Sequence, residues 1–182
     1  KIKHAENAVV NNPDHLVAEV DGKQYFSLQY AINAAAKAGK PVQLIADINL
    51  GGDIVVLEQD VTLDLNGHTI SGTGTAVFQV GSTFTLVDSV GNGAIKHTGS
   101  KDSSTAISIA NGNFIMESGS VTSNHKAVQG GGSNKTNTIT IKGGVINGTD
   151  AALNINKGSN TVSITGGKLV GGYAVHVAAG NG

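Results

Sequence analysis

Apolar residues recur in a fixed arrangement along most of the chain. Leu63 and Leu65 stand on either side of one polar residue, and Ile70 follows after a short polar turn. Similar units begin at Leu63, Phe84, Phe114, Ile139 and Val162. Alternation of apolar and polar residues predicts strands with one buried face, and its recurrence indicates a repeat architecture.

Each unit also contains a third apolar patch, which opens with an alanine. These alanines are Ala76, Ala106, Ala127, Ala151 and Ala174. Short strands separated by turns of Gly, Asn and Ser bury their apolar side only when successive units stack. The pattern therefore predicts an all-β solenoid, a right-handed parallel β-helix with three strands per coil. The right-handed sense is a hypothesis, because periodicity does not determine the hand.

Stacking predicts which residues lie level with one another. The five unit starts should lie above one another along a single axis. In this alignment Asp64 falls level with Thr85 of the next coil and points outward, because Leu63 and Leu65 point inward. No column of acidic residues then forms on that face.

A different pattern precedes the repeats. Asp21-Gly22 is a hairpin-turn dipeptide, Ser27 is a plausible helix N-cap, and Gly39 is a suitable stop before Pro41. The apolar residues of one helical face are Leu28, Ala31, Ile32 and Ala35. A helix at this position would cover the edges and core that the first coil of a solenoid exposes.

These observations predict three regions. Residues 1–16 form an N-terminal extension or linker, and residues 17–60 form an N-terminal cap with a hairpin, a helix and the first strands. Residues 61–182 form the coils, which we expect to continue beyond the C-terminus in a parent protein.

The composition argues against two kinds of binding partner, nucleic acid and the membrane interior. The 12 basic residues are all lysines, and the formal net charge is −1, which argues against nucleic acid as a partner. No apolar run approaches the ~20 residues of a membrane helix, so we expect no direct membrane insertion by this segment. Cysteine is absent, which excludes disulfides and thiolate metal ligands.

The segment "DGKQYFSLQYAINAAAKAGKPVQLIADI", followed by "VTLDLNGHTISG", resembles the N-terminal cap and opening coils of pectate-lyase-like β-helix proteins. It is most similar to non-catalytic repeat regions of large surface proteins from gut-type, mostly Gram-positive bacteria. The resemblance covers roughly residues 17–182 and implies a secreted or wall-attached bacterial protein. The same scaffold carries lyases, hydrolases, tailspikes and adhesins, so the resemblance specifies fold more than activity.

The residues offer little support for lyase or glycoside hydrolase activity. The resemblance to pectate lyases that use an arginine base fails, because the chain has no arginine. Glycoside hydrolysis needs two carboxylates ~5–10 Å apart, for which Asp64 with Asp88 and Asp88 with Glu117 are candidates. No aromatic residue flanks these acids to stack on a sugar, so we interpret them as surface acids.

The remaining candidates are loop residues. His97 and His125 follow the second strand in consecutive coils and form a candidate metal or ligand pair, although two solvated turn residues are the simpler interpretation. Polar loops occupy residues 96–105, 129–138 and 156–160, and the last two should project side by side. The candidate ligand contacts are His97, Lys101, Asp102, His125, Asn134, Lys135 and Asn137.

The sequence thus favours a non-catalytic structural or adhesive β-helix segment of a secreted or wall-attached bacterial surface protein. Its loops are candidate contacts for a glycan or a host surface protein, and no cofactor or metal is expected. The alternative is the N-terminal part of a polysaccharide lyase or glycoside hydrolase whose active site lies outside this chain.

Overall fold

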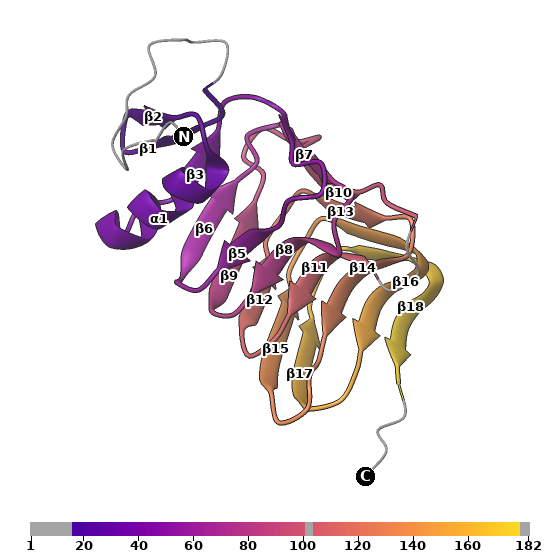
Figure 1. Ribbon diagram of the computed structural model, residues 1–182. Coiled ribbons are helices and arrows are strands. Elements are labelled where there is room, and N and C mark those ends of the chain that lie inside the picture. Colours follow the sequence, from indigo (N-terminus) through magenta and orange to yellow (C-terminus); the bar gives the residue numbers. More distant parts are fainter. Residues whose placement is uncertain (1–15, 101–103, 179–182) are drawn as a thin grey trace.

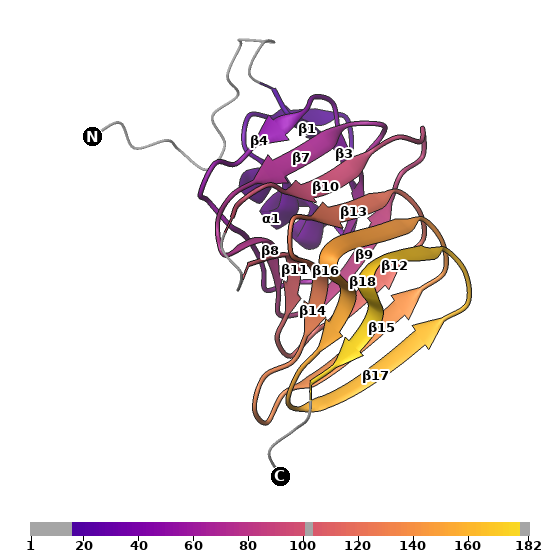
Figure 2. The same ribbon diagram turned by 90° about the vertical axis from the view of Figure 1, so that its right-hand side faces the viewer.

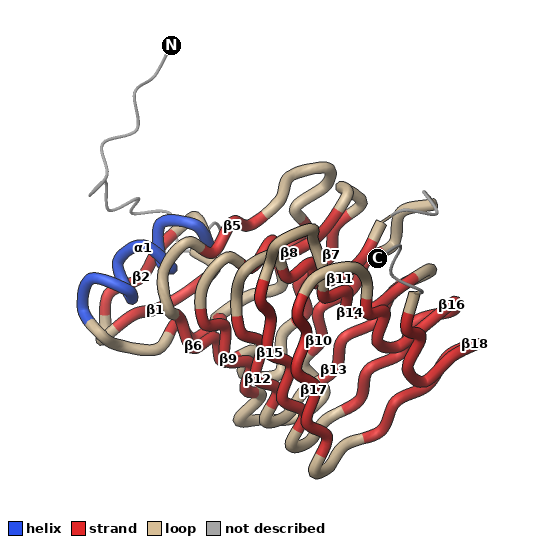
Figure 3. The backbone as a smooth tube through the Cα atoms, turned by 90° about the horizontal axis from the view of Figure 1, so that it is seen from below, coloured by secondary structure: helices blue, strands red, loops and turns tan. Residues whose placement is uncertain are grey.

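The chain forms a parallel β-solenoid of about six turns, preceded by a hairpin and one short helix (Figure 1). The computed structural model describes residues 16–100 and 104–178. Among these residues the helix α1 (Leu28–Ala38) is the only one, and it lies at one end of the stack of strands (Figure 3).

The strands of the solenoid pair in three parallel series. The first series contains β3 (Val42–Leu44), β6 (Val61–Asp64), β9 (Thr83–Val87), β12 (Asn113–Met116), β15 (Thr136–Ile141) and β17 (Ser159–Ile164). The second contains β4 (Ile48–Asn49), β7 (Thr69–Gly72), β10 (Ala94–His97), β13 (Ser120–Ser123) and the first parts of β16 (Val145–Ile155) and β18 (Lys168–Val177). The third contains β5 (Val55–Leu57), β8 (Ala76–Val80), β11 (Thr105–Ile109), β14 (Lys126–Gly130) and the second parts of β16 and β18.

The last two coils differ from the earlier ones. Strands β16 and β18 run through the corner between the second and third series without a loop, so they join both series into one sheet (Figure 2). An irregularity between Gly148 and Ala151 provides the bend. A β-carbon on Gly148 would lie 2.0 Å from the Ala151 carbonyl oxygen, so only glycine fits this corner.

The predicted column of first apolar residues is correct in four of its five members. Phe84, Phe114, Ile139 and Val162 lie level with one another. Leu63 does not: it pairs with Leu86, while Val61 pairs with Phe84. Asp64 accordingly lies level with Val87 rather than Thr85. A shift of two residues keeps every side chain on the same face, so alternation alone could not detect it.

The alanines that open the third apolar patches do not all lie level with one another. Ala76 lies level with Thr105, and Lys126 lies level with both Thr105 and Ala151. The alanines that open each patch are therefore offset by one residue in some coils. Both Ala76 and Val77 are buried at this corner, so burial did not specify which of two neighbouring residues opens the strand.

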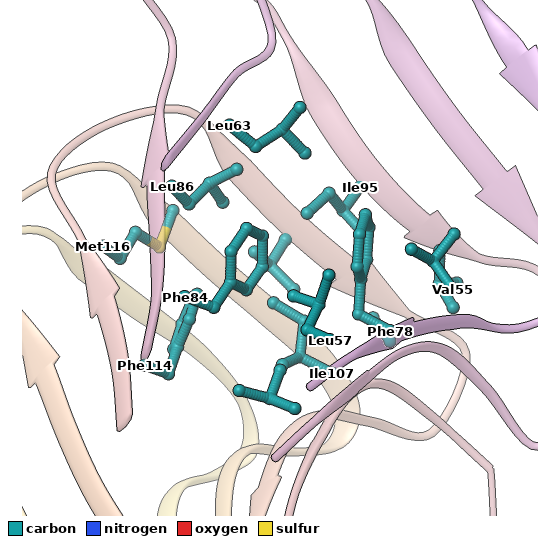
Figure 4. Close-up of a cluster of buried hydrophobic side chains, with 14 of the residues drawn as sticks. Val55, Leu57, Leu63, Phe78, Phe84, Leu86, Ile95, Ile107, Phe114 and Met116 are labelled. Atoms are coloured by element: carbon teal, nitrogen blue, oxygen red, sulfur yellow. The ribbon is translucent and has the colours of Figure 1, made fainter. Parts of the chain in front are cut away.

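The core is a continuous apolar column inside the coils. Three fully buried phenylalanines pack in sequence, with ring centroids 5.1 Å apart for Phe78 and Phe84 and 5.6 Å apart for Phe84 and Phe114. Leu63, Leu86 and aliphatic residues of the other two series surround the rings (Figure 4). A second apolar column contains Ile70, Ile95, Val121, Ile146 and Leu169, which lie level with one another.

The segment before the first coil forms the predicted hairpin and helix. Strands β1 (Ala18–Val20) and β2 (Lys23–Tyr25) pair antiparallel around Asp21 and Gly22, which both have positive φ. Ser27 is the N-cap residue but makes no side-chain cap bond, and Gly39 ends the helix in the left-handed conformation. The four predicted apolar residues of α1 are buried in the same cluster as the first coils.

At the end of the stack opposite α1, inward-facing residues of the last described coil are partly exposed to solvent. Ile139 is fully buried, whereas Val162, which lies level with it, is 36% exposed, and Ile164 is 45% exposed. No described strand pairs with the far edge of β17, so these side chains lack the cover that each earlier coil receives from the next.

Candidate functional site

Two polar loops lie side by side at the corner between the third and first series. The loop after β14 spans residues 131–135, and the loop after β16 spans residues 156–158. The Gly132 amide donates to the Lys157 carbonyl oxygen at 2.8 Å, and the Ser159 amide donates to the Lys135 carbonyl oxygen at 2.8 Å. The predicted juxtaposition of these loops is therefore correct.

The two loops border an open groove of ≈ 800 Å³. Its lining consists of Ser133, Asn134, Lys135, Thr136, Ile155, Asn156, Lys157, Gly158, Ser159, Asn160, Val177 and Ala178. Of the predicted contacts, Asn134 and Lys135 lie here with exposed side chains. Amides, hydroxyls and two lysine ammonium groups give this groove donors and acceptors for a polar ligand.

Asn137, another predicted contact, does not reach the surface. Its side chain is fully buried, its carbonyl oxygen accepts the Asn111 amide at 2.8 Å, and its amide donates to the Asn160 side-chain oxygen at 2.9 Å. The residue belongs to β15 and holds three coils together. Its placement in an exposed loop was wrong, because the chain is already in strand conformation from Thr136.

The predicted pair of histidines occupies the other corner, and only one member is accessible. His97 is 1% exposed, and its Nε2 lies 2.7 Å from the Gly74 carbonyl oxygen, to which it donates. His97 lies level with Ser123, two residues before His125. The His125 Nδ1 lies 3.5 Å from an Asp150 carboxylate oxygen. The expectation that His97 is a solvated turn residue is therefore wrong.

Lys101 and Asp102, the remaining predicted contacts, lie outside the described residues. Among the residues that the structure describes, no group of three or more His, Asp and Glu side chains converges as metal ligands do. The two histidines thus have no third ligand in the described part of their corner.

Asp88, one of the candidate acids, is a structural residue. The residue is 9% exposed, and its two carboxylate oxygens accept the backbone amides of Gly67 at 2.8 Å and Gly93 at 2.7 Å. These amides belong to turns of consecutive coils, since Gly67 follows β6 and Gly93 precedes β10. The carboxylate therefore ties two turns together and has no free oxygen aimed at solvent.

Asp64 is engaged in a similar way. One carboxylate oxygen accepts the backbone amides of Asn66 and Ser89, each at 2.9 Å, and the other lies 3.4 Å from the Gln43 side-chain amide. Burial opposes ionisation of Asp64, but the hydrogen bonds from Ser89, Asn66 and Gln43 outweigh it and hold the pKa below the ordinary value of 3.8. Asp64 is thus an anionic acceptor that joins turns.

Glu117, the last candidate acid, forms an ion pair of 2.8 Å with Lys142 of the next coil. A similar contact links His68 to Asp47, with the His68 Nδ1 3.3 Å from a carboxylate oxygen. That oxygen also accepts the Thr69 amide, and this bond is the main cause of a lowered pKa of Asp47. The acids near the first series therefore interact with neighbouring coils rather than with one another.

Sequence reasoning missed a polar row on the outer face of the third series. Asn154 and His176 pair in register, and the His176 Nδ1 lies 2.8 Å from the Asn154 side-chain oxygen. Tyr173, which is 61% exposed, lies beside His176 with ring centroids 5.2 Å apart. The only sequence signal was the outward position of His176 between the apolar residues Val175 and Val177.

The fold and these contacts define the chain as a parallel β-solenoid, or β-helix, protein whose polar side chains largely join successive coils. No family model, curated protein or solved structure matches the chain. Within the described ranges, no helix has the length and apolar character needed to cross a membrane.

Proposed function

We propose that the chain is a non-catalytic structural or adhesive β-helix segment of a secreted or wall-attached bacterial surface protein. Its role is to hold polar loops on a rigid stack, where they contact a glycan or a host surface protein. The bacterial surface location follows from the resemblance of "LDLNGHTI" and the preceding segment to repeat regions of such proteins, and it belongs to the proposal.

The proposal includes the finer architecture. We take the solenoid to be right-handed with a three-sided coil, and we take α1 with the hairpin to be its N-terminal cap. Three series of parallel pairings support the three-sided coil. The buried face of α1, which packs into the core cluster of the first coils, supports the capping role.

The main support for a non-catalytic role is that the carboxylates of the candidate acids are hydrogen-bonded within the stack. Catalytic carboxylates of glycosidases need oxygens that reach a glycosidic bond and a water molecule. Both oxygens of Asp88 instead accept backbone amides, and Asp64 accepts two amides with one oxygen. These carboxylates stabilise the stack, and their geometry suits a scaffold better than an active site.

The contact surface that the proposal favours is the groove between the two neighbouring loops. Asn134, Lys135 and Lys157 lie on its rim, and the backbone bonds between the loops fix their relative position. A rigid scaffold with polar loops is the usual place for binding residues in repeat proteins.

A glycan and mucin array probed with the 182-residue chain tests this function. The loop variant combines Asn134→Gly, Lys135→Ala and Lys157→Ala; glycine at 134 suits the positive φ of 59° found there. The matched control is Lys37→Ala, which removes an exposed lysine from α1. We expect specific array signals that the loop variant loses and the control keeps, with unchanged circular dichroism for both.

Two outcomes contradict the proposal. Array signals that the loop variant retains in full would exclude the groove as the contact surface. Depolymerisation of a uronate polymer or another polysaccharide by the chain alone would replace the scaffold with an enzyme.

A further inference from the structure

Two turns of consecutive coils contain an Asn-Gly dipeptide. The first is Asn66-Gly67, which follows β6, and the second is Asn92-Gly93, which precedes β10. Both asparagines have positive φ, 49° for Asn66 and 69° for Asn92. Because glycine has no side chain to shield its own nitrogen, an Asn-Gly pair is especially open to attack by that nitrogen on the asparagine side chain.

This attack modifies a protein chain without an enzyme. A base removes the proton of the glycine amide, and the nitrogen then forms a bond to the side-chain carbonyl carbon of the asparagine. The bond from that carbon to the side-chain nitrogen breaks, and this nitrogen takes up a proton and leaves as ammonia, which produces a cyclic succinimide. Water opens the ring at either carbonyl group and yields aspartate or isoaspartate. The net reaction consumes water and releases ammonia, with no oxidation or reduction.

In both turns the attacking nitrogen is bound to the same carboxylate. One oxygen of Asp88 accepts the Gly67 amide at 2.8 Å, and the other accepts the Gly93 amide at 2.7 Å. Each of these glycines directly follows one of the two asparagines. Asp88 therefore binds the very proton that each nitrogen must lose before it can attack.

A carboxylate is an unfavourable neighbour for the reactive form of the nitrogen. The hydrogen bond to the carboxylate must break first, and bonds to charged acceptors are stronger than bonds to neutral ones. At the mildly alkaline pH at which this reaction is measured, an aspartate side chain is anionic and repels the negative charge that develops on the nitrogen. Because Asp88 is 9% exposed, little water surrounds it to weaken this repulsion.

Contacts from the next coil fix the position of Asp88. Its backbone amide donates to the Ser118 hydroxyl oxygen at 2.7 Å, and that hydroxyl lies 3.3 Å from the Asp88 carbonyl oxygen, to which it donates. The carboxylate also packs directly on Gly93, where a β-carbon would lie 2.8 Å from the Asp88 Oδ1. The stack thus holds the carboxylate against both turns.

The two asparagines differ in how much other protection they have. The Asn66 side-chain amide donates to the Leu44 carbonyl oxygen at 2.9 Å, and the residue is half-buried. Asn92 is exposed to solvent, so water reaches its side chain freely. The bond between Asp88 and Gly93 is therefore the more important of the two, and Asn92 is the more sensitive reporter.

We propose that Asn66 and Asn92 are latent modification sites that Asp88 keeps unreactive in the folded chain. An isoaspartate at either position would add a methylene group to the backbone of a turn, and the coils depend on those turns for their register. This inference concerns the chemical lifetime of the scaffold, and it goes beyond the proposed function because it does not depend on a ligand.

Ageing of the 182-residue chain at mildly alkaline pH tests the proposal, with isoaspartate at each position measured by peptide mapping and mass spectrometry. Asp88→Ala frees both glycine amides and should raise the rate at Asn66 and Asn92 by about tenfold or more, with the larger rise at Asn92. Asp88→Asn keeps one acceptor oxygen and should raise the rate by about tenfold at one of the two positions. This second variant serves where alanine prevents folding.

Two controls separate local protection from general stability. Phe84→Ala weakens the core but leaves both Asp88 bonds in place, so it should not raise the rates at Asn66 and Asn92. Two further Asn-Gly pairs, at Asn111 and Asn147, provide a reference within each sample. Among the described residues, no carboxylate accepts the glycine amide of either pair, so the Asp88 variants should leave their rates unchanged.

Three results would overturn the inference. The first is an unchanged rate at both Asn66 and Asn92 in the Asp88 variants. The second is an equal rise at all of the Asn-Gly pairs, and the third is the same rise in Phe84→Ala, because both would assign the effect to general unfolding. None of these results bears on glycan binding, so the proposed function is tested separately.

Discussion

Asp88 provides the sharpest test of how this solenoid is held together. The isosteric replacement Asp88→Asn keeps the shape of the side chain but changes one oxygen into an amide group. That group then faces the backbone amide of Gly67, which is part-buried, or of Gly93, which is buried, so one of these N–H groups loses its acceptor. The bond that remains is made to a neutral acceptor instead of a carboxylate.

The expected magnitude follows from these two losses. A buried polar group without a partner costs about 1–3 kcal/mol, and a bond to a charged acceptor exceeds a neutral one by about 1 kcal/mol. We therefore expect Asp88→Asn to lower the free energy of unfolding by about 3 kcal/mol. For a chain of this size the melting temperature should fall by roughly 6–12 °C.

Thermal unfolding followed by far-ultraviolet circular dichroism measures the effect, with Glu117→Gln as the control. That substitution also removes one negative charge near the first series, but from an exposed pair in which Glu117 is 39% exposed. It should cost less than about 1 kcal/mol. Equal melting temperatures for the two variants would refute the structural role of Asp88, because net charge would then be the only effect.

Three further predictions concern other parts of the stack. Phe84→Ala removes the middle ring of the buried phenylalanine row and should cost about 3–5 kcal/mol in denaturant unfolding; a cost below about 1 kcal/mol would mean that the row is not packed. Asp64→Asn should destabilise the chain at neutral pH. Because the folded-state pKa of Asp64 lies below the ordinary 3.8, this cost should begin to shrink as pH falls past 3.8 and should vanish only below the folded-state pKa. Urea titrations at neutral and strongly acidic pH check this, and an equal difference at both would contradict it. Gly148→Ala places a β-carbon 2.0 Å from the Ala151 carbonyl oxygen, so we expect loss of hydrogen-exchange protection in β16 and β18, whereas native protection would show that the corner can relax.

The repeat itself could be predicted because its signal is local. Alternation of apolar residues assigns strands and buried faces, and glycine or asparagine marks the turns. The four aligned positions from Phe84 to Val162 follow from this pattern, as do the hairpin at Asp21-Gly22 and the buried face of α1. The juxtaposition of the two loops also follows, since each leaves the same corner of consecutive coils.

The first-coil register could not be predicted, because Val61 and Leu63 both point inward. Pairing Phe84 with either residue leaves every apolar side chain in the core, so the pattern contains no preference. The burial of His97 and Asn137 was also missed. Their bonds to Gly74, Asn111 and Asn160 connect residues 23 to 26 positions apart, and no local pattern records such contacts.

The sequence alone determined the solenoid, because each coil repeats the same local requirement for an apolar inside and a turn at its corners. Only the tertiary structure decided which polar side chains join coils and which remain exposed on the surface. Asp88 and Asn137 became internal links, because residues one coil apart in sequence are neighbours in space. Stacking sets those neighbours, and stacking depends on the register of the whole column.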